Sequence, residues 1–117
     1  TAVASEAVIP SYEGVAVIVH TVLFRLARPV SDASIAVFVA HCEAFADATG
    51  HVLERPVVTV DLGLRPEGRS VSEVQMVATF ADAEAFRAYL VDPLHVSLAQ
   101  DVLIPTCETW LSVQAEG

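Results

Sequence analysis

The sequence contains no lysine, because all six of its basic residues are arginines. Schiff-base aldolases, pyridoxal enzymes and Walker-type NTPases each require a lysine, so these classes are excluded. Fifteen acidic residues outweigh the arginines and give a formal net charge of −9. Nucleic acids and anionic membranes are bound through cationic side chains, so we expect neither partner. A small neutral or apolar molecule is the partner that this composition favours.

Cysteine is also scarce. Cys42 and Cys107 lie far apart and form neither a CxxC pair nor a zinc-binding spacing. The four histidines, His20, His41, His51 and His95, show no ligand spacing either, so we expect no metal site. Both thiols are expected to be reduced, which favours a cytoplasmic location, although the sequence leaves a disulfide between them open.

Long hydrophobic runs are absent, although 54% of the residues are hydrophobic and only 18% are charged. No stretch approaches the roughly 20 apolar residues that a membrane span requires. Residues 1–14 lack a basic segment, so we expect a flexible lead-in there and neither a signal peptide nor an anchor. One folded domain is expected over residues 15–114, followed by a short tail at 115–117.

The first half of the domain predicts a strand, a helix and a second strand. Residues 15–26 are rich in β-branched and apolar side chains, which is typical of a strand covered on both faces. Ser31 can cap a helix that Gly50 ends in a left-handed conformation. Four apolar residues recur along one face of that helix: Ile35, Phe38, Cys42 and Phe45. A strand that pauses at Pro56 is expected within residues 52–66.

The second half predicts a strand, two helices and a last strand. Residues 71–80 alternate between apolar and polar side chains. Asp82 can cap a short helix, and Pro93 marks the start of a separate helix that Pro105 ends. The last strand is expected from Thr106 to Gln114.

This order, βαββαβ, is that of the α+β ferredoxin-like fold, a four-stranded antiparallel sheet with helices on one face. We expect the other face to carry valine, methionine and phenylalanine and therefore to need an apolar cover. The simplest cover is the sheet of a second copy, which gives a homodimeric α+β barrel whose interior is shared by two chains.

Residues 80–98, FADAEAFRAYLVDPLHVSL, resemble the stress-responsive α/β-barrel (Dabb) family. The family pattern falls on Phe80, Asp82, Tyr89, Leu90, Pro93, His95 and Val96. The opening VIVHTVLFRL is similar to the family's first strand, and His20 stands where a histidine is common. The resemblance covers about residues 17–113 and implies a dimeric barrel without a metal or organic cofactor.

The resemblance also implies a chemistry, that of polyketide cyclases of the olivetolic acid cyclase type. In this interpretation His95 is the general base that acts on a poly-β-carbonyl chain, and Tyr89 is its hydroxyl-bearing partner. Asp92 departs from the family pattern, in which many members have a second histidine before the proline. An aspartate at that position can raise the basicity of a nearby imidazole, so we count Asp92 among the substrate-site candidates.

The residues themselves are compatible with these roles. His95 lies in the first turn of a predicted helix, where the helix dipole favours a neutral imidazole that can accept a proton. Tyr89 can donate a hydrogen bond to a carbonyl oxygen that becomes an enolate. The alternative, that both are packing residues, stays open at this stage.

Other candidates lie on the predicted strands. By alternation, His20 shares a face with Val22 and Phe24, so we expect it to contact substrate or to be satisfied by the backbone. The predicted cavity walls are Phe24, Met76, Ala78 and Trp110, although such a stripe is also typical of plain core. His41 and His51 are expected at the surface or at a helix cap.

The leading functional hypothesis is a cofactor-independent cyclase, or a related lyase, acting on a small poly-β-carbonyl substrate. A barrel that binds an apolar ligand without catalysis is the first alternative. A cofactor-free monooxygenase or a heme-binding barrel ranks lowest, because several of the related monooxygenases use an asparagine and this sequence has none.

Overall fold

The computed structural model describes residues 17–65, 68 and 70–117, so the predicted lead-in at residues 1–14 lies outside the described part. In chain order the elements are β2 (Ile18–Leu26), α1 (Asp32–Ala48), β3 (Val57–Val60), β4 (Val74–Phe80), α2 (Ala83–Val91), α3 (Pro93–Leu98), a π turn η2 (Ala99–Leu103), α4 (Ile104–Thr106) and β5 (Cys107–Glu116). This order confirms the predicted ferredoxin-like arrangement.

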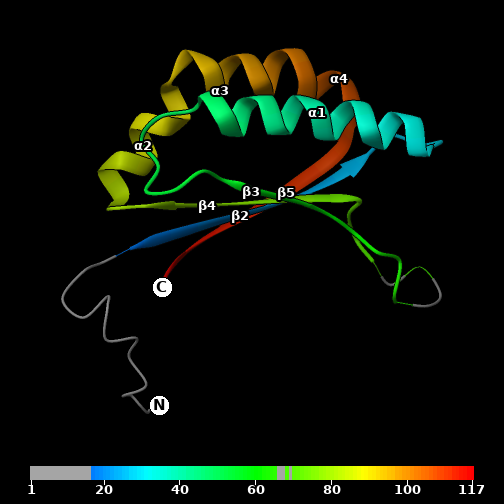
Figure 1. The fold of residues 1–117 in the computed structure, drawn as a ribbon, viewed down its shortest axis with the longest axis horizontal. Helices are drawn as coiled ribbons and strands as arrows, with labels where there is room; N and C mark the ends of the chain where they lie inside the picture. The colour runs from blue at the N-terminus through cyan, green and yellow to red at the C-terminus, as the bar shows by residue number, and fades with distance from the viewer. Residues whose placement is uncertain (1–16, 66–67, 69) are drawn as a thin grey trace, which may run out of the picture.

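The strands form one antiparallel sheet in the order β3-β4-β2-β5. The helices of the described residues lie on one side of this sheet, and no described helix lies on its other side (Figure 1). The two long central strands pair in a register that sets His20 opposite Ala78 and Phe24 opposite Val74. The last strand is an edge, and it pairs with β2 so that His20 lies opposite Gln114.

The core lies between the sheet and the helices. Alternate residues of β2 and β4 are buried on this side, among them Phe24, Val74, Met76 and Phe80. The prediction that this valine, methionine and phenylalanine face is the side of the sheet away from the helices is wrong. Both faces of β2 are apolar, so alternation alone could not show which face the helices cover.

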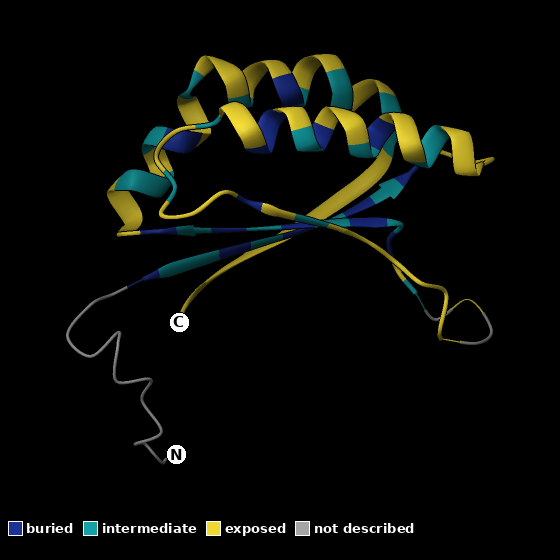
Figure 2. Cartoon of the chain, in the orientation of Figure 1, coloured by how far each residue is buried: buried dark blue, intermediate teal, exposed yellow. Residues whose placement is uncertain are grey.

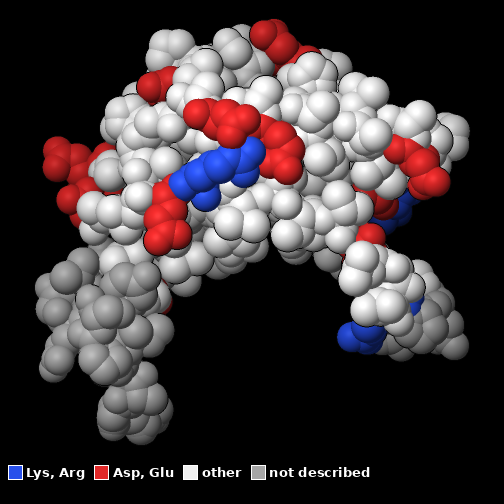
Figure 3. Space-filling view, viewed as in Figure 1, with Lys and Arg blue, Asp and Glu red and all other residues white. Residues whose placement is uncertain are grey.

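The open face carries the other set of alternating residues and no comparable block of large side chains. Its apolar members are Val19, Leu23, Val57, Val77, Leu111 and Val113, and threonines lie between them. Figure 3 shows the molecule hollowed beneath the sheet, with mostly uncharged atoms around the hollow on the side that is visible. Among the residues that the structure describes, no segment covers this face.

Side-chain caps fix the starts of the helices as the sequence predicts. Ser31 and Ser34 form a reciprocal capping box on α1, and Asp82 accepts a hydrogen bond from the Ala85 amide at the start of α2. The predicted left-handed stop at Gly50 is wrong. Helix α1 ends at Ala48 with Thr49 as its C-cap, and the left-handed residue that follows is His51, with φ 72°.

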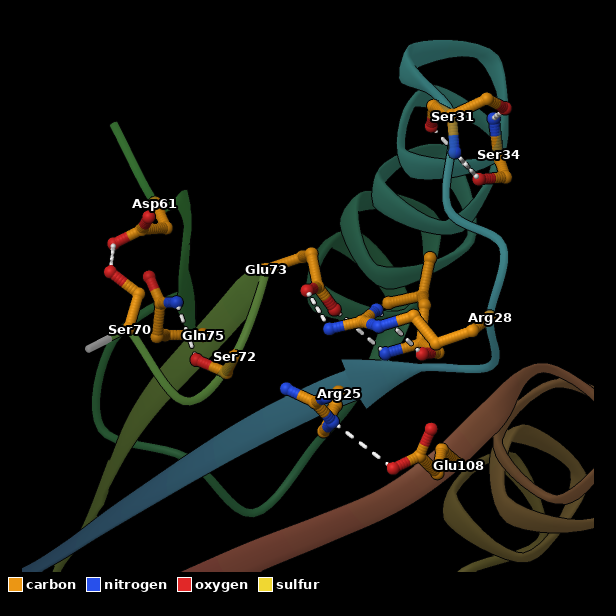
Figure 4. A network of polar contacts seen from close by, with 11 residues as sticks. Arg25, Arg28, Ser31, Ser34, Asp61, Ser70, Ser72, Glu73, Gln75 and Glu108 are labelled. Atoms are coloured by element: carbon orange, nitrogen blue, oxygen red, sulfur yellow. Dashed lines mark hydrogen bonds and ion pairs between the residues drawn. The ribbon is translucent and has the colours of Figure 1, made fainter. Parts of the chain in front are cut away.

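Glu73 anchors the end of β2 through its side-chain carboxylate. Its carboxylate accepts one hydrogen bond from the Leu26 amide at 2.8 Å and another from the Arg28 guanidinium at 2.8 Å (Figure 4). Partial burial opposes the charge, but these two bonds outweigh it and lower the carboxyl pKa. Arg25 pairs with Glu108 at a more exposed position beside it.

Pro105 does not end its helix, contrary to the prediction. A proline has no amide hydrogen and its ring collides with the carbonyl four residues earlier, so a regular α-helix is disfavoured here. The chain instead widens into η2, in which the Ile104 amide donates to the Ala99 carbonyl, and the helix continues to Thr106. Two residues of this π turn, Ala99 and Leu103, line the cavity described below.

Strand boundaries also differ from the predictions. Within the described part of the expected strand at residues 52–66, the strand runs from Val57 to Val60, because Pro56 stands before it and a glycine-containing loop follows. Strand β5 continues to Glu116, so residues 115 and 116 are not the expected tail. In the described residues, no helix is both long and apolar enough to cross a membrane.

Candidate functional site

A cavity of about 230 Å³ lies between the sheet and the helices of the single chain. Its polar lining groups are His20, Tyr89, His95 and Ser112, and apolar residues form the remainder. No aspartate, glutamate or arginine belongs to the described lining. The cavity is therefore an apolar space that brings together two imidazoles and two hydroxyl groups.

Three different elements supply the reactive side chains. His20 projects from β2, Tyr89 from the last turn of α2 and His95 from the first turn of α3. Asp92 joins these helices, because it ends α2 and its carboxylate accepts a hydrogen bond from the Leu94 amide at the start of α3. The sharp turn at Asp92 and Pro93 is what turns His95 back toward Tyr89.

Aromatic packing holds the three rings together. The centroids of Tyr89 and His95 are 4.8 Å apart, and those of Tyr89 and His20 are 5.9 Å apart. Phe80 packs edge-on against Tyr89 at 4.8 Å, and Phe45 contacts the rings of both Tyr89 and His95. This packing restricts the side-chain rotamers before any ligand enters.

His95 is poised as a neutral base. Desolvation lowers the pKa of its imidazole, while a hydrogen bond to the backbone of Leu90 and the charge of Asp92 oppose that change. The net direction is below the ordinary value, so the imidazole is unprotonated at neutral pH. A neutral imidazole can accept a proton, as general base catalysis requires.

Tyr89 is poised as a neutral donor. Its side chain is almost entirely buried, and burial raises the pKa of its hydroxyl. Within the described part of the chain, no residue hydrogen-bonds this hydroxyl and no fully buried polar side-chain atom lacks a partner. The hydroxyl is therefore reached from the cavity that Tyr89 lines, where it can donate to a ligand oxygen.

His20 is the second neutral imidazole of the cavity. It is 5% exposed, and desolvation together with the positive charge that His95 can carry lowers its pKa to about 4. The side-chain nitrogen of Gln114 lies 2.8 Å from its Nδ1 and 3.1 Å from the Ser112 hydroxyl oxygen. Sequence analysis missed both Gln114 and Ser112, because only the register of β5 against β2 brings them to the helix-facing side.

The structure brings together most of the predicted site residues. His95, Tyr89, His20, Phe24, Met76 and Trp110 all line the cavity. Ala78 is buried opposite His20 in the sheet and does not belong to the lining, because its side chain is too short to reach past the larger residues. These residues face the helices of their own chain, so the predicted interior shared by two chains is not where they lie.

Asp92 does not line the cavity either, contrary to the prediction. One of its carboxylate oxygens caps α3, and the other lies 3.2 Å from His51 Nε2. The hydrogen bond from Leu94 is the largest cause that lowers its pKa, followed by His51. Asp92 therefore acts on the site at a distance, through its charge and the turn it holds.

The remaining histidines and the cysteines stay outside the site. His41 and His51 are exposed, as expected. Cys42 and Cys107 are free, and burial raises their pKa values to about 12 and about 11. The residues that the structure describes contain no cluster of three or more histidine, cysteine or acidic side chains that could hold a metal ion.

Comparison with known proteins shows the family of the chain. The model of the stress-responsive A/B barrel domain, Dabb, matches residues 18–116. The chain belongs to this family. No curated protein shows significant similarity to the sequence.

Solved structures place the Dabb chain among ferredoxin-like proteins. A Dabb family protein from Mesorhizobium loti is 22% identical, covers 87% of this chain and 97% of its own, and gives a TM-score of 0.74. A dimeric ferredoxin-like protein of unknown function from Thermobifida fusca is also 22% identical, with coverages of 87% and 92% and a TM-score of 0.72. The hydroxynitrile lyase of Passiflora edulis is 19% identical, with coverages of 87% and 94% and a TM-score of 0.70. At these identities the similarity shows the fold.

Proposed function

We propose that this Dabb protein is a cofactor-independent cyclase, or a related lyase, that acts on a small neutral poly-β-carbonyl compound. The observation that carries the proposal is an apolar cavity in which His95 is a neutral base 4.8 Å, between ring centroids, from a buried tyrosine. The resemblance to polyketide cyclases of the olivetolic acid cyclase type rests on the same two residues. The similar fold of a hydroxynitrile lyase supports the inclusion of lyase chemistry.

In the proposed reaction His95 accepts a proton from a carbon that lies between two carbonyl groups. The electron pair of that C–H bond forms an enolate, and the Tyr89 hydroxyl donates a hydrogen bond to the enolate oxygen. The enolate carbon then attacks a second carbonyl of the same molecule, forming a C–C bond. The oxygen of that carbonyl takes up the proton that His95 carries, so the base is regenerated.

The lining of the cavity selects the substrate by charge and size. No cationic side chain among the described lining residues can compensate a buried carboxylate or phosphate, and burying such a charge without a partner is costly. Drug-sized ligands occupy cavities of about 300–1,000 Å³, and this one measures about 230 Å³. The reacting part of the substrate is thus neutral and smaller than a typical drug.

The proposal includes a homodimer formed through the open face of the sheet. Apolar residues on β5 of this face are well exposed in the single chain, including Leu111 at 62% and Val113 at 57%. Figure 2 shows β5 as exposed over most of its length, whereas the central strands are largely buried. The similar Thermobifida fusca protein is described as dimeric. Two free cysteines favour a reducing compartment, and we propose the cytoplasm.

The test is product analysis by mass spectrometry after mixing the protein with a panel of linear β-polyketide thioesters and esters. Such chains cyclise spontaneously, so the proposal predicts a protein-dependent change in the pattern of cyclic products. His95→Ala is expected to lower the rate of the catalysed product by about 10²–10⁴-fold. Tyr89→Phe is expected to lower the rate of the catalysed product by a smaller factor than His95→Ala does, because phenylalanine keeps the packing of the ring.

His41→Ala is the matched control, since His41 is an exposed histidine on α1 away from the reactive groups. Catalysis that survives in a folded His95→Ala protein would remove His95 from the mechanism. A panel on which the protein binds neutral compounds without altering their products would instead identify a ligand-binding barrel.

A further inference from the structure

Gln114 is the polar partner of a buried imidazole in the candidate site. It lies opposite His20 in the β2 and β5 ladder, and both side chains are on the helix-facing side of the sheet. Its amide nitrogen is 2.8 Å from His20 Nδ1 and 3.1 Å from the Ser112 hydroxyl oxygen. One amide group thus contacts two residues that line the cavity.

The donor chemistry of this contact indicates which ring nitrogen of His20 carries the proton. An amide nitrogen donates hydrogen bonds and does not accept them, so His20 Nδ1 is the acceptor. Burial and the neighbouring His95 keep the ring of His20 neutral. A neutral imidazole carries one proton on its ring nitrogens. Because Nδ1 is the acceptor of the hydrogen bond, this proton is on Nε2.

The protonated nitrogen is reached from the cavity. Among the described residues, His20 Nε2 has no hydrogen-bond partner, and no fully buried polar side-chain atom is left without one. Because His20 as a whole is only 5% exposed and lines the cavity, Nε2 is accessible through that space. His20 thus presents an N–H group to a ligand, while His95 presents a neutral base.

We propose that Gln114 is a positioning residue that holds His20 as the Nε2–H tautomer, so that His20 donates a hydrogen bond to a substrate oxygen. This inference rests on the proposed function for its catalytic meaning, whereas the tautomer itself does not. In this proposal the two histidines have different roles. His95 accepts the proton from carbon, and His20 together with Tyr89 stabilises the oxygen that becomes negative. Ser112 accepts the second amide hydrogen and keeps the Gln114 side chain oriented.

The direct test is nitrogen NMR of the histidine side chains in uniformly labelled protein. Coupling of ring protons to Nδ1 and Nε2 distinguishes the two tautomers and the imidazolium. The wild-type protein is expected to show His20 as the Nε2–H form at neutral pH. A wild-type protein with the proton on Nδ1 would overturn the proposal.

Gln114→Glu supplies the informative variant. A carboxylate only accepts hydrogen bonds, so it is expected to draw the His20 proton to Nδ1 or to stabilise the imidazolium. Gln100→Glu is the matched control, because Gln100 is an exposed glutamine on η2, and its spectrum is expected to stay that of the wild type. An unchanged Nε2–H tautomer in folded Gln114→Glu would also overturn the proposal.

Kinetics then connect the tautomer to catalysis. On a substrate that the wild-type protein converts, Gln114→Glu is expected to lower kcat about tenfold or more, because a transition-state donor is lost, and to change KM much less. A loss confined to KM would assign Gln114 to ground-state binding and overturn its role in catalysis. Failure of the wild-type protein on every substrate would refute the proposed function while leaving the NMR result intact.

Discussion

His95 and His20 bring the same side chain into one cavity, and their surroundings differ. His95 is desolvated, but a backbone hydrogen bond to Leu90 and the charge of Asp92 partly restore its affinity for a proton. His20 has the Gln114 amide as its polar partner. Desolvation by burial, followed by the charge that His95 can carry, lowers the pKa of His20 to about 4. At residue scale the structure thus separates a base from a donor by environment alone.

A first prediction concerns the acid limb of the rate profile. His95 must be neutral to act as a base, so kcat/KM is expected to fall as pH decreases through a pKa below 6.5. Asp92→Asn removes a charge that raises this pKa, so the limb is expected to move to lower pH, while asparagine still caps α3. Rate profiles of both proteins check this; a limb that moves to higher pH would contradict the assignment of the base.

A second prediction concerns stability in acid. Because the folded-state pKa of His20 is depressed to about 4 from 6.5, the unfolded chain takes up a proton that the folded chain excludes. The free energy of unfolding is not reduced by this effect above about pH 6.5. It declines as the pH falls toward 4, by an amount on the order of 2–3 kcal/mol. His20→Leu is expected to reduce this decline. Urea unfolding at several pH values measures it, and an identical decline in His20→Leu would exclude His20 as its source.

At the scale of elements, the sequence predicted the helix starts well and the helix ends poorly. Ser31 and Asp82 cap through local hydrogen bonds, which a short pattern encodes. After the C-cap Thr49, the left-handed residue is His51 and not Gly50, and the ring of His51 contacts Asp92, 41 positions away. The π turn before Pro105 is equally hard to read, because proline more often ends a helix than widens it.

The junction between β2 and α1 gives a third prediction. Glu73 accepts hydrogen bonds from Leu26 and Arg28 at a site that is mostly buried, with 20% of its side chain exposed. Glu73→Ala leaves both donors unpaired and is expected to destabilise the protein by about 1–3 kcal/mol in urea unfolding. Glu108→Ala is the control, because its pair with Arg25 is exposed and is expected to contribute about 0–1 kcal/mol. Equal losses in the two variants would contradict an anchoring role for Glu73.

For the whole molecule, the order of strands and helices along the chain and the two-layer arrangement followed from the sequence. Which face of the sheet the helices cover did not. Strand β2 is apolar on both faces, so its pattern could not show whether the face that carries Met76 and Phe80 lies against the helices or against a second sheet. Because this face lies against the helices, the candidate cavity is within the single chain and not in an interior shared by two chains. His95 and Tyr89 were recognisable from a motif, whereas Gln114 and Ser112 depend on pairing between distant strands.

A fourth prediction follows from the uncovered face of the sheet. Leu111→Glu combined with Val113→Glu puts two charges on that face, and the variant is expected to convert a dimer into a monomer in sedimentation velocity. Val37→Glu is the control, because Val37 is 61% exposed but lies on α1. A wild-type protein that sediments as a monomer at micromolar concentration would contradict the homodimer.

The central claim, that His95 removes a carbon-bound proton inside a neutral cavity, is tested most directly by deuterium exchange. Small uncharged ketones and β-keto esters are incubated in D₂O with the protein, and exchange at the carbon next to the carbonyl is followed by NMR against a protein-free control. The account predicts saturable exchange that His95→Ala abolishes and His41→Ala preserves, with anionic β-keto acids exchanging no faster than without protein. Exchange that is the same in wild-type and His95→Ala protein would contradict it.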